Sequence, residues 1–167
     1  MNPLVQLAGA AEWWSGVYNA TRFLQIGTTF AHLGGLLVGG GFAIATDAAT
    51  LRAARAAMAR RRRQLAYIHG IHRPVLLGLG LTLASGLLMF AADVETFAAS
   101  LVFWVKMLLV SLLLANGALM ARTETRLRAG GAAVDRGWRV LRASAYCSLT
   151  LWLAAALAGT LLMNPAE

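Results

Sequence analysis

The sequence predicts an all-α integral membrane protein: a four-helix bundle with an N-terminal amphipathic helix lying at the membrane interface. Three observations predict this class. Of the 167 residues, 59% are apolar and only 13% are Asp, Glu, Lys or Arg, which is about half the charged share of soluble domains. The mean hydropathy is +0.64. Four apolar runs are each long enough to cross a bilayer, which takes roughly 20 residues. This composition excludes a water-soluble enzyme and a disordered chain.

The elements follow one another in a simple order. Residues 2–19 carry apolar side chains at helical spacing, and we expect this segment to lie at the interface with Trp13, Trp14 and Tyr18 at headgroup level. Four spans are predicted at about residues 23–46, 74–92, 97–121 and 140–163. Two basic loops, 47–73 and 122–139, connect them. The whole chain, 1–167, is therefore expected to form a single transmembrane domain.

The distribution of arginine predicts the orientation. The two loops hold nearly all the basic residues, including the run Arg60 to Arg63, whereas the connection between the second and third spans contains Asp93 and Glu95 and no basic residue. Positive loops stay in the cytoplasm. We therefore expect a multi-pass protein of a bacterial-type inner (plasma) membrane with both termini outside. The net charge of +8 is explained by topology and anionic headgroups, so no nucleic-acid partner is expected.

The first span is rich in glycine. Gly35 and Gly39 share a helical face with His32. Glycines allow two membrane helices to approach closely, and the same positions also leave room for a flat cofactor. Both interpretations are compatible with the sequence.

Two ionisable residues lie inside predicted spans, where such groups are costly and are candidates for function. His32 follows Arg22 by ten residues and Lys106 follows Glu95 by eleven. At the rise of an α-helix, both lie roughly 15 Å below the outer membrane surface. The sequence therefore predicts that the imidazole and the ammonium group meet at one level.

Each of these residues also has a structural explanation. The ring of His32 can form a hydrogen bond to Ser85 or Thr82 of the second span. The side chain of Lys106 can extend along apolar surface to the headgroups, or it can point inward to an anion.

Histidine is a common metal ligand, and His32 is the first candidate for this role. His72 is the alternative candidate, and His69 lies three residues before it. It precedes the second apolar run and is expected at the inner surface. Its level differs from that of His32 by on the order of 10 Å or more, which argues against one haem held by both histidines.

Two segments resemble a known group of membrane proteins. The run TTFAHLGGLLVGGG is similar to the first-helix motif of the HemJ and CopD families, and SLVFWVKMLLVSLLLANG is similar to their later lysine-containing helix. The HemJ resemblance implies a b-type haem and protoporphyrinogen oxidation, with His32 and Lys106 at the matching positions. The CopD resemblance implies copper handling.

Together these observations give one leading hypothesis. The chain is expected to be a membrane redox protein that binds haem b, with His32 as axial ligand of the iron, Lys106 beside the cofactor, and Gly35 and Gly39 beneath the ring. Its role would be electron transfer or porphyrin oxidation, with a quinone as lipid-phase partner. The alternatives are a non-catalytic accessory subunit of a larger membrane complex and a copper-handling protein. The partners considered are other membrane proteins or further copies of this chain.

Overall fold

The computed structural model describes residues 3–130 and 134–163, with the backbone alone described for residues 3–10, His69 and Met163; within these ranges the chain forms helices and no strand. The helices are α1 (Pro3–Ala20), α2 (Arg22–Ala53), α3 (Met58–Ala92), α4 (Val94–Ala99), α5 (Leu101–Arg128) and α6 (Val134–Met163). Four of them, α2, α3, α5 and α6, are long and apolar enough to cross a membrane. The chain is an all-α, multi-pass membrane protein, which confirms the predicted class.

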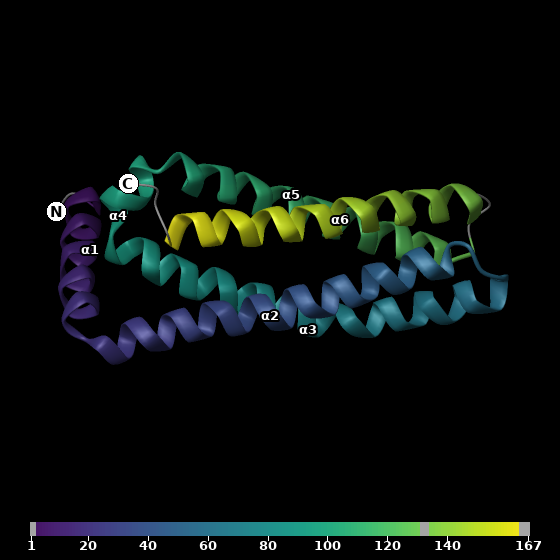
Figure 1. Cartoon of the computed structure of the whole chain (residues 1–167), viewed down its shortest axis with the longest axis horizontal. Coiled ribbons are helices and arrows are strands. Elements are labelled where there is room, and N and C mark those ends of the chain that lie inside the picture. Colours follow the sequence, from purple (N-terminus) through teal and green to yellow (C-terminus); the bar gives the residue numbers. More distant parts are fainter. Residues whose placement is uncertain (1–2, 131–133, 164–167) are drawn as a thin grey trace.

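The four long helices run side by side, and the two ends of the bundle differ (Figure 1). At one end, which we call the terminal end, α1 runs across the bundle and α4 joins α3 to α5. At the other end, which we call the arginine-rich end, the chain turns from α2 into α3 and from α5 into α6. Contacts join α2 to α3 and α6, and α5 to the same two helices. Within the described residues the backbones of α2 and α5 are not close neighbours, so these helices are diagonal across the bundle.

Polarity is distributed as a bilayer requires, with large apolar side chains outside and small or polar ones inside. Phe23 is 88% exposed, Leu101 77% and Leu37 76%, which is the surface that lipid tails solvate. The buried polar side chains are Thr28, Thr46, Asp47, Thr50, Ser85, Glu124, Ser144 and Ser148. Since lipid gives helices no hydrophobic drive to associate, close packing and hydrogen bonds between such residues stabilise the bundle.

The tightest helix contact joins α2 to α3 through glycines. A Cβ on Gly35 would lie 2.5 Å from Thr82 Oγ1 and 2.7 Å from the carbonyl oxygen of Gly78. A Cβ on Gly39 would lie 3.2 Å from the amide nitrogen of Leu79, and one on Gly78 would overlap the backbone of Gly39. The space that side chains would take at Gly35 and Gly39 is therefore filled by α3. These two glycines bring helices together and do not face an open space for a ring.

The helices are longer than the apolar runs that predict them. Helix α2 continues to Ala53 and α3 already begins at Met58, because the Ala- and Arg-rich sequence between the spans consists of good helix formers. The third span begins at Leu101 instead of residue 97. Ser100 caps this helix by accepting a hydrogen bond from the Phe103 amide at 3.4 Å and separates it from α4.

The N-terminal helix is present and is bonded to the rest of the protein. The expected element covers residues 2–19, of which residue 2 lies outside the described part; α1 covers Pro3–Ala20. Trp14 donates through Nε1 to the carbonyl of Leu88 at 2.8 Å, and the hydroxyl groups of Tyr18 and Thr28 are 2.9 Å apart. Only Trp13, 67% exposed, is free to reach headgroups. The aromatic residues at 14 and 18 instead fasten α1 across the terminal end.

The glycine contact leads to a first prediction. Gly78→Ala forces a Cβ into the backbone of α2, so we expect the free energy of unfolding to fall by about 1–3 kcal/mol, the usual cost of overpacking. The control is Gly34→Ala, where a Cβ meets nothing within 4 Å and where alanine adds up to about 1 kcal/mol of helix propensity. Unfolding by sodium dodecyl sulfate in mixed micelles measures both. Equal stability of the two variants would contradict the close α2–α3 contact.

Candidate functional site

His32 lies on α2 and faces α3. Its Nδ1 is 3.2 Å from Ser85 Oγ, and its Cε1 would lie 3.2 Å from a Cβ on Gly86. The hydroxyl of Thr82 lies 3.4 Å from the His32 carbonyl oxygen. The predicted hydrogen bond between this histidine and the second span is thus confirmed, and it follows from the close α2–α3 approach.

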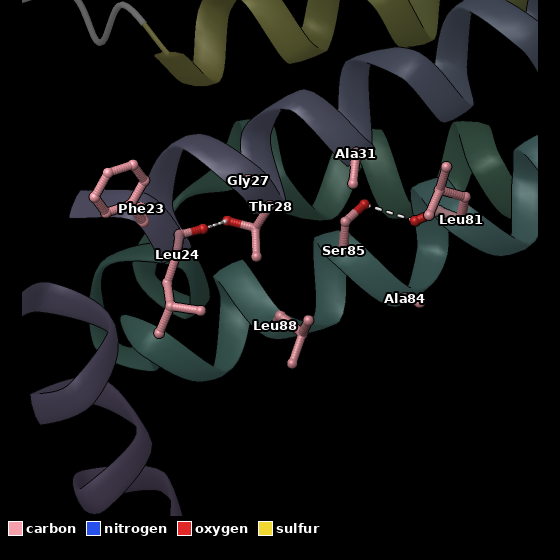
Figure 2. A pocket seen from close by; sticks show the side chains of 9 residues that line it. All are labelled: Phe23, Leu24, Gly27, Thr28, Ala31, Leu81, Ala84, Ser85 and Leu88. Atoms are coloured by element: carbon pink, nitrogen blue, oxygen red, sulfur yellow. Dashed lines mark hydrogen bonds between the residues drawn. The ribbon is translucent and has the colours of Figure 1, made fainter. Parts of the chain in front are cut away.

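The hydrogen bonds of Ser85 determine which nitrogen of the ring carries the proton. Ser85 donates its only hydroxyl hydrogen to a backbone carbonyl of its own helix, that of Leu81 at 2.6 Å being the nearest (Figure 2). The hydroxyl oxygen is then left to accept from His32, so the Nδ1 of a neutral imidazole carries the hydrogen. In that tautomer the lone pair is on Nε2, and the Thr82 backbone also hydrogen-bonds the ring. The imidazole is therefore oriented by α3, with the Nε2 lone pair as its candidate ligand atom.

Lys106 lies on α5, diagonally across the bundle from α2. Its side chain packs against α6, with Nζ 3.6 Å from the position of a Cβ on Gly159. Nowhere in residues 3–130 and 134–163 is there a hydrogen-bond or ion-pair partner for this ammonium group. Among the described residues it thus has no counterion, and it lies at the terminal end of the bundle.

The level of Lys106 follows from the break at Ser100. Because α4 and α5 are separate helices, its depth counts from Leu101 and is roughly 8 Å at the helical rise, about half of the predicted 15 Å. Ser85, the partner of His32, lies roughly 10 Å in from the end of α3 at Ala92 by the same rise. Both helix ends flank α4 (Figure 1). By this count the two side chains lie at similar depth on helices that are diagonal across the bundle.

An apolar groove of about 250 Å³ lies beside this site, between α2 and α3. Figure 2 shows Ser85 on the α3 side of the groove, with Leu81 and Leu88 on the same helix and Phe23 and Leu24 on α2. The serine that orients the histidine thus also lines a surface of the kind that lipid-soluble molecules contact.

His72 lies in a different part of the protein. Its Nε2 is 3.2 Å from Glu124 Oε2, and the other oxygen of that carboxylate accepts a hydrogen bond from Arg128 at 3.2 Å. His72 precedes Ser85 on α3 by thirteen residues, a helical distance of roughly 20 Å. His32 and His72 therefore do not lie at one level, as expected. The side chain of His69 lies outside the described residues.

The described part of the chain contains no group of three or more His, Cys, Asp or Glu side chains placed to hold a metal ion. A haem iron takes its equatorial ligands from the porphyrin and needs only an axial nitrogen from the protein, so this finding does not bear on haem.

Two buried acidic residues are absent from the sequence-based candidates. Asp47 was assigned to the first loop, yet it lies within α2 and is only 2% exposed. Glu124 was assigned to the second loop, and it is 2% exposed within α5. The available signals were the apolar residues that flank Asp47 and the i,i+4 spacing of Glu124 and Arg128, which is typical of an intrahelical ion pair.

Comparisons with known proteins identify no relative. No family model, no curated protein and no solved structure matches the chain.

The ion pair at the arginine-rich end gives a second prediction. Arg128→Met removes a charged hydrogen bond from a buried carboxylate, and we expect the free energy of unfolding to fall by about 1–2 kcal/mol. Arg126→Met is the matched control, because Arg126 makes no hydrogen bond or ion pair with any described residue. Detergent unfolding measures the difference, and a larger loss for the control would contradict the assigned role of Arg128.

Proposed function

We propose that the chain is a membrane redox protein that binds haem b at the terminal end of the bundle, with His32 as an axial ligand through Nε2. The observation that carries this proposal is the Nε2 lone pair of a histidine whose Nδ1 is held by Ser85. Histidines that ligate metals characteristically donate their other ring N–H to a neighbouring acceptor, which fixes the orientation and the tautomer. His32 has this arrangement inside a span, where an ionisable residue is a functional candidate.

Lys106 supplies the charge that such a cofactor requires. Haem carries propionate groups, and an unpaired ammonium group at similar depth provides a counterion for one of them. The pairing also explains why an otherwise costly cation is kept within a span. The resemblance to the HemJ family supports the same two residues.

The surroundings limit where the cofactor lies. Gly35 and Gly39 pack on α3, so in this proposal they hold His32 in place and do not contact the porphyrin ring. When bound, haem supplies one-electron oxidation and reduction, and the reaction class is electron transfer or porphyrin oxidation. The chain's own residues orient the ligand, balance the charge and exclude water.

The cellular setting belongs to the same proposal. The arginine-rich end faces the cytoplasm of a bacterial-type inner membrane, because basic residues stay on that side, and both termini face outward. A quinone is the proposed redox partner because it is soluble in the lipid phase, and a larger membrane complex or a second copy of the chain supplies further contacts.

The third prediction concerns the ligand. Protein purified in mild detergent is expected to show a Soret band, or to acquire one on titration with haemin, and His32→Ala is expected to abolish it. His72→Ala is the control and should retain the band, because His72 lies roughly 20 Å away along α3. Absence of the band from the wild type after haemin titration would overturn the proposal and leave the accessory-subunit alternative.

The fourth prediction concerns Ser85. Ser85→Ala removes the side-chain partner of His32 Nδ1, and loss of such a partner typically weakens metal binding 10- to 100-fold. We therefore expect haem affinity to fall by at least about 10-fold while the helix content stays the same. Thr82→Val tests the neighbouring hydroxyl, which reaches the His32 backbone and not its ring, and it should leave the affinity within about 3-fold.

A further inference from the structure

A second polar region lies in the bundle, toward the arginine-rich end. A cavity of about 90 Å³ is lined by residues of all four long helices. Its polar lining consists of Thr46, Asp47, His72, Asn116, Ser148 and Trp152. The cavity is too small for a typical organic ligand, whose pockets measure about 300–1,000 Å³. It is large enough for about three water molecules at roughly 30 Å³ each.

Two of the lining side chains have a polar atom without a partner. Asp47 is 2% exposed and Trp152 is 5% exposed, and within the described ranges neither Asp47 Oδ2 nor Trp152 Nε1 forms a hydrogen bond. Ser148 supplies a hydrogen bond to the Asp47 carboxyl, which leaves the second oxygen unsatisfied. A buried polar group without a partner costs about 1–3 kcal/mol, so two of them at one cavity indicate a ligand.

The chemistry of the two atoms identifies that ligand. The indole N–H of Trp152 is only a donor, and the carboxyl oxygen of Asp47 is an acceptor when ionised. Water satisfies both atoms at once, whereas a bare cation would be repelled by the indole hydrogen. Buried waters typically make about three hydrogen bonds to groups of this kind. The observations therefore favour water over a metal ion.

His72 connects the cavity with the surface. The residue lines the cavity, and its side chain is 35% exposed. Its Nε2 is 3.2 Å from Oε2 of Glu124. Its Nδ1 has no hydrogen-bond partner among residues that the structure describes. Beyond Glu124 lies Arg128, whose side chain is 44% exposed. An imidazole with one nitrogen on a carboxylate and the other free is a suitable proton carrier, because it can accept a proton at one nitrogen and release one from the other.

Apolar side chains separate the cavity from the terminal end of the bundle. Leu113, Trp152 and Ala155 form a buried cluster, against which Leu36 and Leu109 pack. This cluster lies between the cavity and the level of His32 and Lys106. The polar side chains that could carry a proton to Asp47 therefore lie on the arginine-rich side of this cluster.

We propose that the cavity holds ordered water and that Asp47 exchanges its proton with the medium at the arginine-rich end through this water and His72. The O–H bond of the protonated carboxyl breaks as the proton passes to a cavity water, and that water gives a proton to the imidazole, so no oxidant or reductant is required. The charged groups facing Asp47 are His72 on α3 and, behind it, Glu124 and Arg128 on α5. From α6 the cavity receives only the neutral Ser148 and Trp152. The proposal does not depend on haem.

The fifth prediction tests this site by infrared difference spectroscopy of the full chain in lipid nanodiscs during pH titration. We expect the carbonyl band of a protonated carboxyl group that shifts in D2O and is absent from Asp47→Asn. Glu95→Gln, which alters an exposed carboxylate on α4, is the control and should leave the band unchanged. The indole of Trp152 packs on Gly40, where a Cβ would lie 3.2 Å from Cε3 and Cζ3 of the ring. Trp152→Phe retains an aromatic ring at this position but removes the N–H, and it should shift the band. Trp104→Phe, a tryptophan bonded to Ala98 instead, should not.

The kinetics separate a proton path from a structural carboxyl group. His72→Phe should retain the band but slow its appearance after a pH jump by about 100-fold, the lower end of what a positioned proton carrier contributes. A band insensitive to D2O, or unaltered in both Asp47→Asn and Trp152→Phe, would overturn the proposal. So would an unchanged rate in His72→Phe. Displacement of the band by sodium at constant pH would replace the proton site by a cation site.

Discussion

The backbone contact between α2 and α3 is the constraint on which the terminal-end site depends. Gly35 and Gly39 meet Gly78 without a side chain between them, and this close approach brings the ring of His32 within hydrogen-bond distance of Ser85. A larger residue at any of the three positions would move the helices apart by more than a hydrogen bond tolerates. A packing feature thus determines the tautomer of an imidazole one turn away.

The bundle separates its polar groups into two regions. His32 and Lys106 lie near the terminal end, and the cavity around Asp47 lies toward the arginine-rich end. Between them, leucines from several helices exclude water. The haem proposal concerns the first region and the proton proposal concerns the second. The two proposals are independent, because each rests on its own residues.

Buried polar groups in this protein fall into two kinds. Most are satisfied within the chain, as in the pair formed by Asn116 and Ser144, whose side chains are 2.6 Å apart, and the carboxylate of Glu124. Among the described residues, three fully buried side-chain atoms are not: Oδ2 of Asp47, Nε1 of Trp152 and Nε of Arg61. In an apolar medium an unsatisfied group is costly, so water is proposed at the two that share a cavity, on Asp47 and Trp152.

The sequence by itself determined the membrane class, the four spans and the candidacy of His32 and Lys106, because apolar run length and the cost of ionisable groups in lipid are local properties of the chain. It also indicated Ser85 as a partner of His32. Only the tertiary structure decided that Gly35 and Gly39 contact α3, that Ser100 starts a new helix and so halves the depth of Lys106, and that Asp47 is buried. The reason is that each of these depends on which helix lies opposite and where a helix is capped. Hydropathy alone placed Asp47 in a loop, since it measures the polarity of a residue and not the polarity of its neighbours on α3, α5 and α6.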